Sequence, residues 1–284
     1  MSSIVEVENV WFSYPQKEPV LKHITFKIRR GEFLGIIGRN GSGKSTLMKA
    51  LVGLIKPTKG TVLVDGLNTR QEKVSTMARK VGFIFQNPND QLFCKSVEEE
   101  VAFALRNLGS PEDEVRRMVD ETLDRFSLKT VRDVYPRFLS RGDKQRVSVA
   151  AISAMKTKIL ILDEPTTGQD YRDSTEIMEY AKAMNSDGRT VILVTHDVRN
   201  VAAYTKRTIL LEEGEIVADT STRHMLTENR LLRECGLLPP QITELAKNCE
   251  RIGVRPDILS VDEMTNEFLR VLRGSPHATC RGEE

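Results

Sequence analysis

The chain has 284 residues, and its 42 basic side chains nearly balance its 40 acidic ones, which gives a formal charge of +2. This balance does not favour nucleic-acid binding through a basic surface, and no apolar run reaches the ~18 residues of a membrane-spanning helix. The cysteines Cys94, Cys235, Cys249 and Cys280 form no CxxC pair, so we expect them to be reduced rather than metal-bound or paired.

The first part of the chain predicts strands. Apolar residues alternate or run together in four stretches, 4–14, 20–28, 33–38 and 80–86, and a hairpin is expected at 60–66. The stretch 33–38, Phe-Leu-Gly-Ile-Ile-Gly, is continuously apolar, which is typical of a strand buried on both faces. A helical pattern follows it at residues 47–54.

A helical region interrupts the strands at about residues 88–156. Ser96 and Glu99 fit a capping box at the start of one helix, Gly109 ends it, and Ser110-Pro111 begins the next. Strands resume at 158–163, 190–195 and 208–217 with helices between them, so we expect an α/β fold with a mainly parallel sheet. Beyond residue 222 the chain should be mostly helical, with a frayed end at 274–284.

A phosphate-binding loop is predicted between the strand at 33–38 and its helix. Residues 38–45, Gly-Arg-Asn-Gly-Ser-Gly-Lys-Ser, match the pattern GxxxxGKS/T. The glycines let backbone N–H groups wrap a phosphate, Lys44 supplies positive charge to the outer phosphates, and the Ser45 hydroxyl is placed to ligate Mg²⁺. The sequence therefore predicts a nucleoside triphosphate site formed by Gly38, Asn40, Gly41, Ser42, Gly43, Lys44, Ser45 and Thr46.

Polar side chains also end three other buried strands. Asp163 is suited to hold Mg²⁺ through water, and Glu164 to activate an attacking water as general base. An Asp-Glu-Pro turn often ends a strand for structural reasons alone, but the carboxyl ends of parallel strands gather at the edge where ligands bind. We therefore predict one site, with these catalytic residues: Glu164, His196, Gln86 and Lys44. The predicted metal ligands are Ser45, Gln86 and Asp163.

The order of these motifs resembles the nucleotide-binding subunit of an ATP-binding cassette (ABC) transporter over roughly residues 3–220. The resemblance rests on the phosphate loop, Gln86, Leu-Ser-Arg-Gly-Asp at 139–143, Asp163-Glu164, Asp170 and His196. It implies an ATPase that binds ATP and Mg²⁺, with a P-loop cassette at residues 1–222. The cassette would comprise an N-terminal antiparallel β subdomain, a mainly parallel core and the helical subdomain at about 88–156, with a small helical extension at 223–284.

The resemblance also implies roles for residues outside the strand ends. Tyr14 would stack on adenine, with Trp11 and Phe12 in the core. Two subunits would pair head to tail, so that each ATP lies between one phosphate loop and segment 139–143 of the other subunit. Asp170 would communicate across that interface, and the residues of the segment that approach the γ-phosphate would be Ser140 and Gly142.

Segment 139–143 departs from the family pattern at two positions, with Arg141 in place of glycine and Asp143 in place of glutamine. Ser140 and Asp143 are spaced as an N-cap pair. A carboxylate ~7 Å from a phosphate costs on the order of 2 kcal/mol at an effective dielectric of ~20, and Arg141 would offset most of this cost. We expect an altered but working segment, either in a homodimer with equivalent sites or in a heterodimer whose variant site is weaker.

Three further stretches, 85–93, 96–109 and 236–246, resemble the ATPases of energy-coupling-factor transporters, which import vitamins or transition-metal ions. The resemblance implies a membrane-spanning subunit, a substrate-capture subunit and a second ATPase subunit as partners, and no nucleic acid. It also implies a peripheral location at the cytoplasmic face of the cell membrane. Gln91, Leu92 and Phe93 would form part of the groove for the membrane subunit. Alternatively, Leu92 and Phe93 belong to the core of the helical region.

Two other functions remain open from the sequence. A soluble cassette ATPase that acts on nucleic acid or ribosomes is disfavoured by the single cassette, the short insertion and the small net charge. An importer ATPase for another solute would share every catalytic residue. The extension could serve dimerisation, regulation or packing against the cassette.

Overall fold

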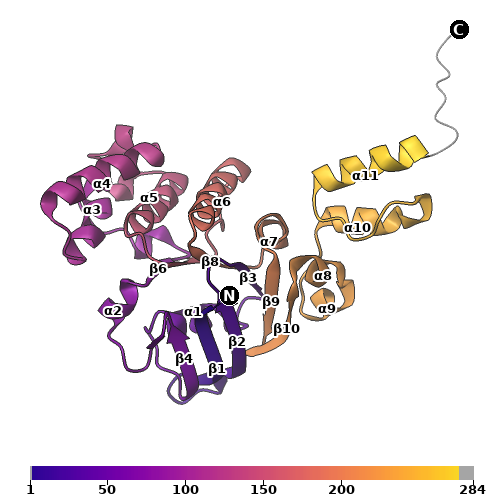
Figure 1. Ribbon diagram of the computed structural model, residues 1–284, viewed down its shortest axis with the longest axis horizontal. Coiled ribbons are helices and arrows are strands. Elements are labelled where there is room, and N and C mark those ends of the chain that lie inside the picture. The colour runs from indigo at the N-terminus through magenta and orange to yellow at the C-terminus, as the bar shows by residue number, and fades with distance from the viewer. Residues whose placement is uncertain (1, 275–284) are drawn as a thin grey trace, which may run out of the picture.

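The computed structural model describes residues 2–274, in which no helix is both long and apolar enough to cross a bilayer. An antiparallel sheet is formed by the N-terminal strands (Figure 1). Its strands, in spatial order, are β2 (Pro19–Arg29), β1 (Ser3–Ser13), β4 (Lys59–Val64) and β5 (Leu67–Asn68). Alternating residues of β2 are buried, so one face of this sheet packs on the core and the other faces solvent.

A second, six-stranded sheet forms the centre of the molecule. Its spatial order is β10 (Glu215–Ser221), β9 (Arg207–Glu212), β3 (Phe33–Ile37), β8 (Thr190–Thr195), β7 (Ile159–Asp163) and β6 (Val81–Ile84). All pairs are parallel except β9 with β10. Every residue of β3, β7 and β8 is buried. The predicted α/β fold with a mainly parallel sheet is therefore confirmed.

Two predicted strand boundaries were wrong. The stretch 208–217 is an antiparallel hairpin, because Glu213 and Gly214 both have positive φ, 47° and 81°, and reverse the chain between β9 and β10. The strand predicted to reach Gln86 ends at Ile84. The apolar run continues past the last residue that pairs with β7, so hydrophobicity alone overestimates the strand.

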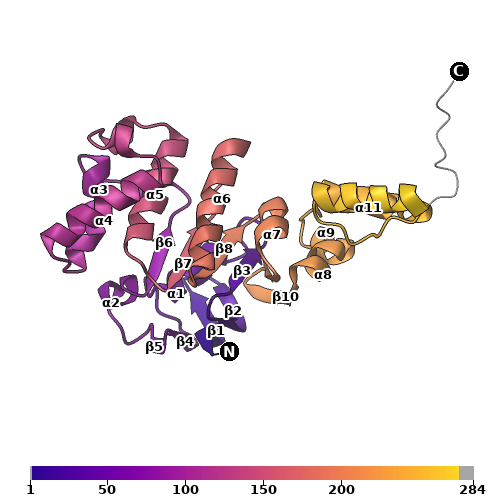
Figure 2. The same cartoon turned by 45° about the horizontal axis from the view of Figure 1, so that its top comes forward.

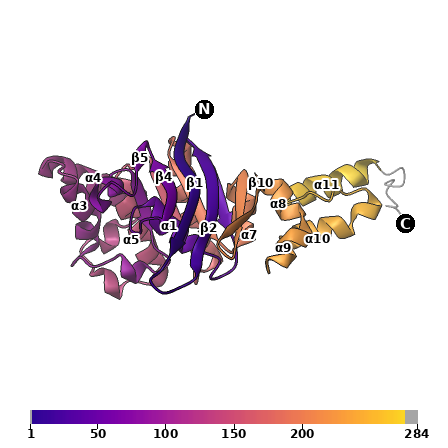
Figure 3. The same ribbon diagram turned by 90° about the horizontal axis from the view of Figure 1, so that it is seen from below.

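Helices cover the sheets and extend the molecule to both sides (Figures 2 and 3). The first group is α1 (Lys44–Leu51), α2 (Val74–Ala78), α3 (Val97–Asn107), α4 (Glu112–Arg125), α5 (Arg141–Ala154), α6 (Tyr171–Ser186) and α7 (Val198–Tyr204). The second is α8 (Thr222–Thr227), α9 (Asn229–Glu234), α10 (Gln241–Asn248) and α11 (Val261–Gly274). Short 3₁₀ turns occur at Pro88–Asp90, Lys129–Val131, Pro136–Phe138 and Glu250–Ile252.

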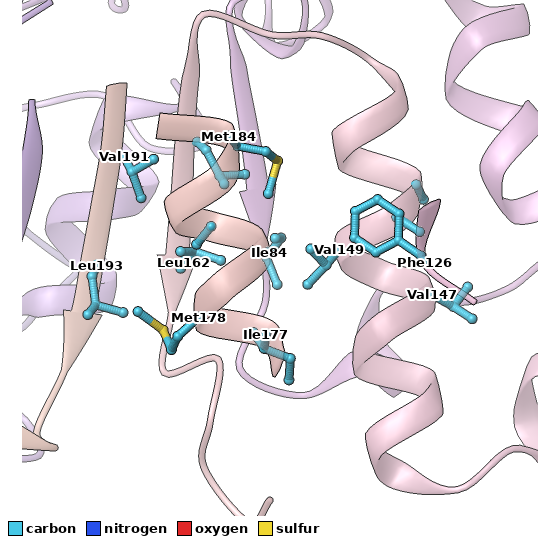
Figure 4. Close-up of a cluster of buried hydrophobic side chains, with 14 of the residues drawn as sticks. Ile84, Phe126, Val147, Val149, Leu162, Ile177, Met178, Met184, Val191 and Leu193 are labelled. Carbon is cyan, nitrogen blue, oxygen red and sulfur yellow. The ribbon is translucent and has the colours of Figure 1, made fainter. Parts of the chain in front are cut away.

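Alternate residues of the central strands face two different cores. In β7, Leu160 and Leu162 pack with the helical region, whereas Ile159 and Ile161 pack with the antiparallel sheet and α1. This is the consequence of the two-residue period of a strand. Figure 4 shows the first core, with these labelled side chains: Ile84, Phe126, Val147, Val149, Leu162, Ile177, Met178, Met184, Val191 and Leu193.

Ser96 caps the start of α3 as predicted, but the Glu99 carboxylate bonds the residue before the cap rather than the cap itself. The Ser96 hydroxyl accepts from the Glu99 backbone N–H at 3.2 Å, while the Glu99 carboxylate accepts from the Lys95 backbone N–H at 3.1 Å. The next helix, α4, follows Pro111, and its apolar stripe is buried. These two helices pack with α5 to form the helical region.

The C-terminal helices have a small hydrophobic cluster of their own. Its buried members are Ala246, Val254, Ile258 and Met264. The extension also reaches the phosphate loop: a Cβ placed on Gly236 would stand 2.6 Å from Cδ of Arg39 and 2.8 Å from its Nε. Nearby, a groove of about 980 Å³ is lined by residues 196–199 and 236–242, among others. The predicted frayed end lies outside the described residues apart from residue 274, and so does Cys280. The three described cysteines are free.

A buried carboxylate ties three segments together at the turn after β4. Asp65 is bonded by Arg30 at 2.7 Å, Lys158 at 2.8 Å and Lys80 at 3.1 Å, and its side chain is 5% exposed. Burial opposes ionisation, but the bonds from Lys158, Arg30 and Lys80 hold the pKa of the carboxyl well below its ordinary value. A low pKa in the folded state contributes stability above the unfolded pKa, and this stability is lost as the pH falls.

Replacing Asp65 by asparagine should therefore lower the free energy of unfolding by about 1–3 kcal/mol at neutral pH. Asparagine tolerates the positive φ of 48° at this position. The decrease in the free energy of unfolding is therefore due to the lost charge and not to backbone strain. Urea unfolding of both proteins at pH 7 and at pH 3 measures the effect. The difference should shrink at the lower pH, because the carboxyl of the unfolded native sequence is then largely protonated while the folded one is still ionised, which removes part of the stabilisation. An equal difference at both pH values would contradict this interpretation.

Candidate nucleotide-binding and catalytic site

The phosphate loop lies between β3 and α1. Glycine is required at residue 38, because a Cβ there would stand 2.1 Å from the carbonyl oxygen of Leu211 in β9. Gly43 has a φ of +103°, a conformation that side chains rarely adopt. The Ser42 hydroxyl is buried and has no hydrogen-bond partner among the described residues. The loop therefore leads into a helix N-terminus that is suited to an anion.

The Lys44 ammonium lies inside this loop. Its Nζ donates to the carbonyl oxygens of Gly38 at 2.7 Å and Arg39 at 2.8 Å. Burial lowers the pKa of Lys44, and nearby carboxylates, led by Glu164 and Asp163, oppose that shift. The acidic end of β7 and the lysine of the loop therefore belong to one electrostatic site.

Asp163, the last residue of β7, suits a metal ligand. It is 5% exposed, and its Oδ1 has no hydrogen-bond partner among the described residues. Burial raises the pKa of this carboxyl, and the neighbouring Ser45 hydroxyl opposes the shift. Because Mg²⁺ binds hard oxygen donors through one or two protein groups plus waters and phosphates, Asp163 and Ser45 together fit this ion.

Glu164 is fixed by donors from β8 and from its own loop. Its Oε2 accepts from the hydroxyls of Thr167 and Thr195, each at 3.2 Å. Its Oε1 accepts from the His196 backbone N–H at 3.1 Å and lies 2.8 Å from Nδ1 of the His196 ring. Glu164 is buried and has a φ of 49°, a strained value for a residue with a side chain. The carboxylate is therefore held in one orientation, as a general base requires.

The parallel strands bring the predicted polar residues to one edge of the sheet. Neighbours in the order β3-β8-β7-β6 have their carboxyl ends at the same edge, which places the phosphate loop, His196, Asp163-Glu164 and Gln86 in a row. Gln86 is exposed and lies two residues beyond the end of β6. It is the outermost of these groups, at the strand that pairs only with β7.

Tyr14 lies beside the phosphate loop, one residue beyond the end of β1. Its hydroxyl is 3.5 Å from the Thr46 hydroxyl of α1, and its ring packs on Phe12 at 4.9 Å between centroids. Phe12 is buried as expected. Trp11 is only half-buried, so its assignment to the core was wrong. The reason is the alternation along β1, which turns this side chain away from the core that holds Phe12. The indole N–H of Trp11 instead donates to the Asn9 side chain at 3.0 Å.

Segment 139–143 begins α5, and Ser140 caps that helix. The Ser140 hydroxyl accepts from the Asp143 backbone N–H at 3.1 Å and donates to its carboxylate at 2.8 Å. Asp143 forms an ion pair with Arg146 at 3.4 Å, one turn along the same helix. Arg141, which we expected to offset the Asp143 charge, instead donates to a backbone carbonyl in the loop after Glu164.

Two other predicted residues also contact α6. A Cβ on Gly142 would stand 2.0 Å from the Asp173 carboxylate, so the start of α5 lies directly against the start of α6. Asp170 caps α6 by accepting from the Asp173 backbone N–H at 2.8 Å. Among the described residues, segment 139–143 thus bonds to its own helix and to the turn before it, and packs against residues 167–173, but makes no hydrogen bond to the phosphate loop.

The three residues predicted to form a docking groove point in different directions. Leu92 is 4% exposed and belongs to the helical-region core, which bears out the alternative interpretation for this residue. The Gln91 side chain donates to the Ser148 carbonyl and accepts from the Phe85 backbone N–H, each at 3.4 Å. Only Phe93 faces outward, with 59% of its surface exposed.

Sequence reasoning missed residues that shape this site. Thr195 and Thr167 hold Glu164, and Glu212 lies close enough to Lys44 to act on its pKa. None belongs to a recognisable motif. Thr195 could have been found as the residue that ends a buried strand directly before His196, but the donor role of Thr167 depends on how its loop folds.

The fold and the site define a cassette-type P-loop nucleotide hydrolase. The chain belongs to the ABC transporter family, whose sequence model, described as ABC transporter, matches residues 21–167. It is 37% identical to the energy-coupling factor transporter ATP-binding protein EcfA of Methanothermobacter thermautotrophicus, over 95% of this chain and 88% of that protein. It is also 36% identical to an ABC transporter ATP-binding protein of Methanosarcina acetivorans over 99% of this chain, but spans only 45% of that protein's length.

Solved structures share the fold. One is cbiO1 from Clostridium perfringens, described as part of the ABC transporter complex cbiONQ, with a TM-score of 0.74 and 34% identity. The match covers 87% of this chain and 100% of that one. A dimeric ATP-binding cassette in a post-hydrolysis state, bound to ADP and Pi, has a TM-score of 0.70 and 31% identity, over 77% of this chain and 98% of that one.

Proposed function

We propose that this chain is the ATP-hydrolysing subunit of an energy-coupling-factor type importer, which takes up a vitamin or a transition-metal ion. The observation that carries the catalytic part is the Glu164 carboxylate, held against His196 at the edge of the sheet that also carries the phosphate loop. The transport part is supported by the similarity to EcfA and to cbiO1.

In the proposed reaction, Glu164 takes a proton from the water that attacks the γ-phosphate, and Lys44 and His196 stabilise the charge on the transferring group. Thr195 and Thr167 keep the Glu164 carboxylate directed at that water. Ser45, Asp163 and Gln86 would hold Mg²⁺, which neutralises charge on the outer phosphates when it is bound.

We also propose a head-to-tail dimer. The contacts of segment 139–143 run to its own chain's loop after Glu164, so a second subunit is needed to bring this segment to a phosphate loop. Ser140 and Gly142 would face the γ-phosphate of the partner subunit's nucleotide. The partner is either a second copy or a related subunit. In either case the cassette comprises residues 1–222 and the extension residues 223–284.

The transport assignment is tested by isolating the chain from gently solubilised membranes and identifying what copurifies. A membrane-spanning subunit together with a small substrate-capture protein would support it and would show that the chain associates with the membrane. A membrane-spanning subunit that copurifies with a capture protein of another kind than this small one would favour an importer of another solute class. Recovery of only soluble, nucleic-acid-bound partners would refute the transport assignment.

Phe93 is the proposed anchor for the membrane subunit. It packs edge-on against Phe103, with ring centroids 4.8 Å apart, and both rings are exposed. The buried carboxylate of Glu100 accepts from the backbone N–H groups of Phe93 and Cys94 and so fixes the loop that presents the ring. An exposed aromatic pair on a rigid loop is typical of a protein interface.

Replacing Phe93 by glutamate should reduce recovery of the membrane subunit by about tenfold or more, since a charge would replace the exposed aromatic ring that the membrane subunit is proposed to cover. ATP affinity should be unchanged, because the ring lies outside the nucleotide site. Copurification and ATP titration measure the two effects. Val74 in α2, an apolar residue that is 44% exposed, gives a matched control as Val74→Glu, which should retain the partner. Loss of ATP binding in the Phe93 variant would show instead that this residue supports the fold.

A further inference from the structure

The side chain of Arg141 is bonded within its own chain. Its Nη2 donates to the Thr167 carbonyl at 2.8 Å, and Gln169 donates from its side-chain amide to the Arg141 carbonyl at 3.5 Å. The guanidinium also lies flat enough against Gly168 that a Cβ there would stand 2.9 Å from Cζ. The start of α5 is therefore fastened to residues 167–169 by bonds in both directions and by close packing.

The fastened loop is the one that orients the general base. The Thr167 hydroxyl donates to Glu164 at 3.2 Å, and the Thr167 backbone N–H donates to the Glu164 carbonyl at 3.3 Å. A continuous path therefore runs from the Arg141 guanidinium through the backbone and hydroxyl of Thr167 to the Glu164 carboxylate. Glycine, which the family pattern carries at position 141, has no side chain to make this connection.

We propose that Arg141 is a positioning residue for Glu164, an inference that rests on the proposed ATPase function. Arg141 stands in the segment that faces the partner subunit's nucleotide, whereas Glu164 acts on the nucleotide of its own chain. The contact therefore joins one ATP site to the general base of the other. Arginine suits this role because its planar fork both donates to the carbonyl and covers the backbone of Gly168, which a lysine ammonium cannot do.

The test compares Arg141→Gly, Arg141→Lys and Thr167→Val in the full chain, purified with whatever partners accompany it. Arg141→Gly should lower kcat by about 3–10-fold and leave KM for ATP within about twofold, since a misplaced base slows the chemical step without weakening binding. Arg141→Lys should show a similar loss. The double variant Arg141→Gly with Thr167→Val should lose no more than the stronger single variant, because both changes break one path.

If Arg141 instead acted through its positive charge on the partner's phosphate, the pattern would be the opposite. Arg141→Lys would then keep the native kcat, and Arg141→Gly would raise KM for ATP. That result, or losses in the two single variants that multiply in the double variant, would overturn the proposal. Arg137→Ala removes an exposed positive charge from the turn before α5 and should match the native protein.

Hydrogen exchange tests the same contact without turnover. In Arg141→Gly, the amides of residues 166–169 should exchange about tenfold faster, while those of α5 are unchanged. Unchanged exchange in this loop would contradict the proposal. A native protein that does not hydrolyse ATP with its partners present would instead refute the proposed function, and the exchange experiment would still decide whether Arg141 holds the loop.

Discussion

Replacing Glu164 by glutamine is expected to lower ATP turnover by about 10²–10⁴-fold while nucleotide binding persists. Glutamine keeps the shape of the side chain and can still accept from Thr167 and Thr195, but it cannot take a proton from water. Phosphate release and calorimetric titration with ATP measure the two properties. Glu121, an exposed glutamate in α4, provides the matched control as Glu121→Gln, which should hydrolyse ATP at the native rate.

The same variant should retain ATP and so reveal how the subunits pair. Two equivalent retained nucleotides per dimer would favour a homodimer and would exclude a weaker variant site. One retained nucleotide, together with a second kind of ATPase subunit, would favour the heterodimer. Hydrolysis at the native rate by the Glu164 variant would remove Glu164 from the role of general base.

Replacing Asp163 by asparagine is expected to lower Mg²⁺-dependent turnover by at least about 10²-fold, since the metal loses its charged protein ligand. The free energy of unfolding without Mg²⁺ should rise, by on the order of 1 kcal/mol, because the variant no longer buries a carboxylate that lacks a full set of donors. Burial raises the pKa of Asp163 in the folded state, so the native carboxylate costs stability above its unfolded pKa.

The sign of the stability change is the sharpest part of this prediction. The gain should be largest near neutral pH and should vanish as the pH falls below the unfolded pKa of an aspartate, where the native carboxyl is protonated as well. Urea unfolding across this range measures it. Asp65→Asn is the natural comparison, because the same chemical change should have the opposite sign there. A destabilised Asp163 variant would show that the carboxylate is already compensated in the native protein.

The sequence was sufficient for features whose signals are local. The strand, loop and helix at 33–51 occupy consecutive residues. The apolar run predicts the buried strand, and the glycines and the lysine predict the phosphate loop between this strand and the helix. The order of polar strand ends also followed from the sequence, because parallel strands share an edge. Capping residues and helix breakers predicted the helical region, the sequence beyond residue 222 also predicted helices, and the family pattern added the antiparallel sheet.

Features that depend on distant contacts could not be predicted in this way. The donors of Glu164 include Thr195, which is far from it in sequence and becomes a neighbour only when β7 and β8 pair. Leu92 and Phe93 are adjacent apolar residues, yet Leu92 is buried and Phe93 is exposed. The sequence could not distinguish them, because the packing of α3 and α5 decides which of the two is covered. From the sequence, Arg141 has the character of a surface charge. Its contact with the loop after Glu164 becomes evident only in the folded structure.

The contact between Arg39 and Gly236 constrains how this chain can evolve. Arg39 occupies a position that the phosphate-loop pattern leaves open, and Gly236 lies in the extension, where a Cβ would stand against the arginine side chain. Any side chain at 236 is disfavoured by the left-handed backbone there, with a φ of +64°, and would also have to displace the exposed and flexible side chain of Arg39. Residue 236 is therefore expected to stay glycine, which keeps the first turns of the extension against the phosphate loop.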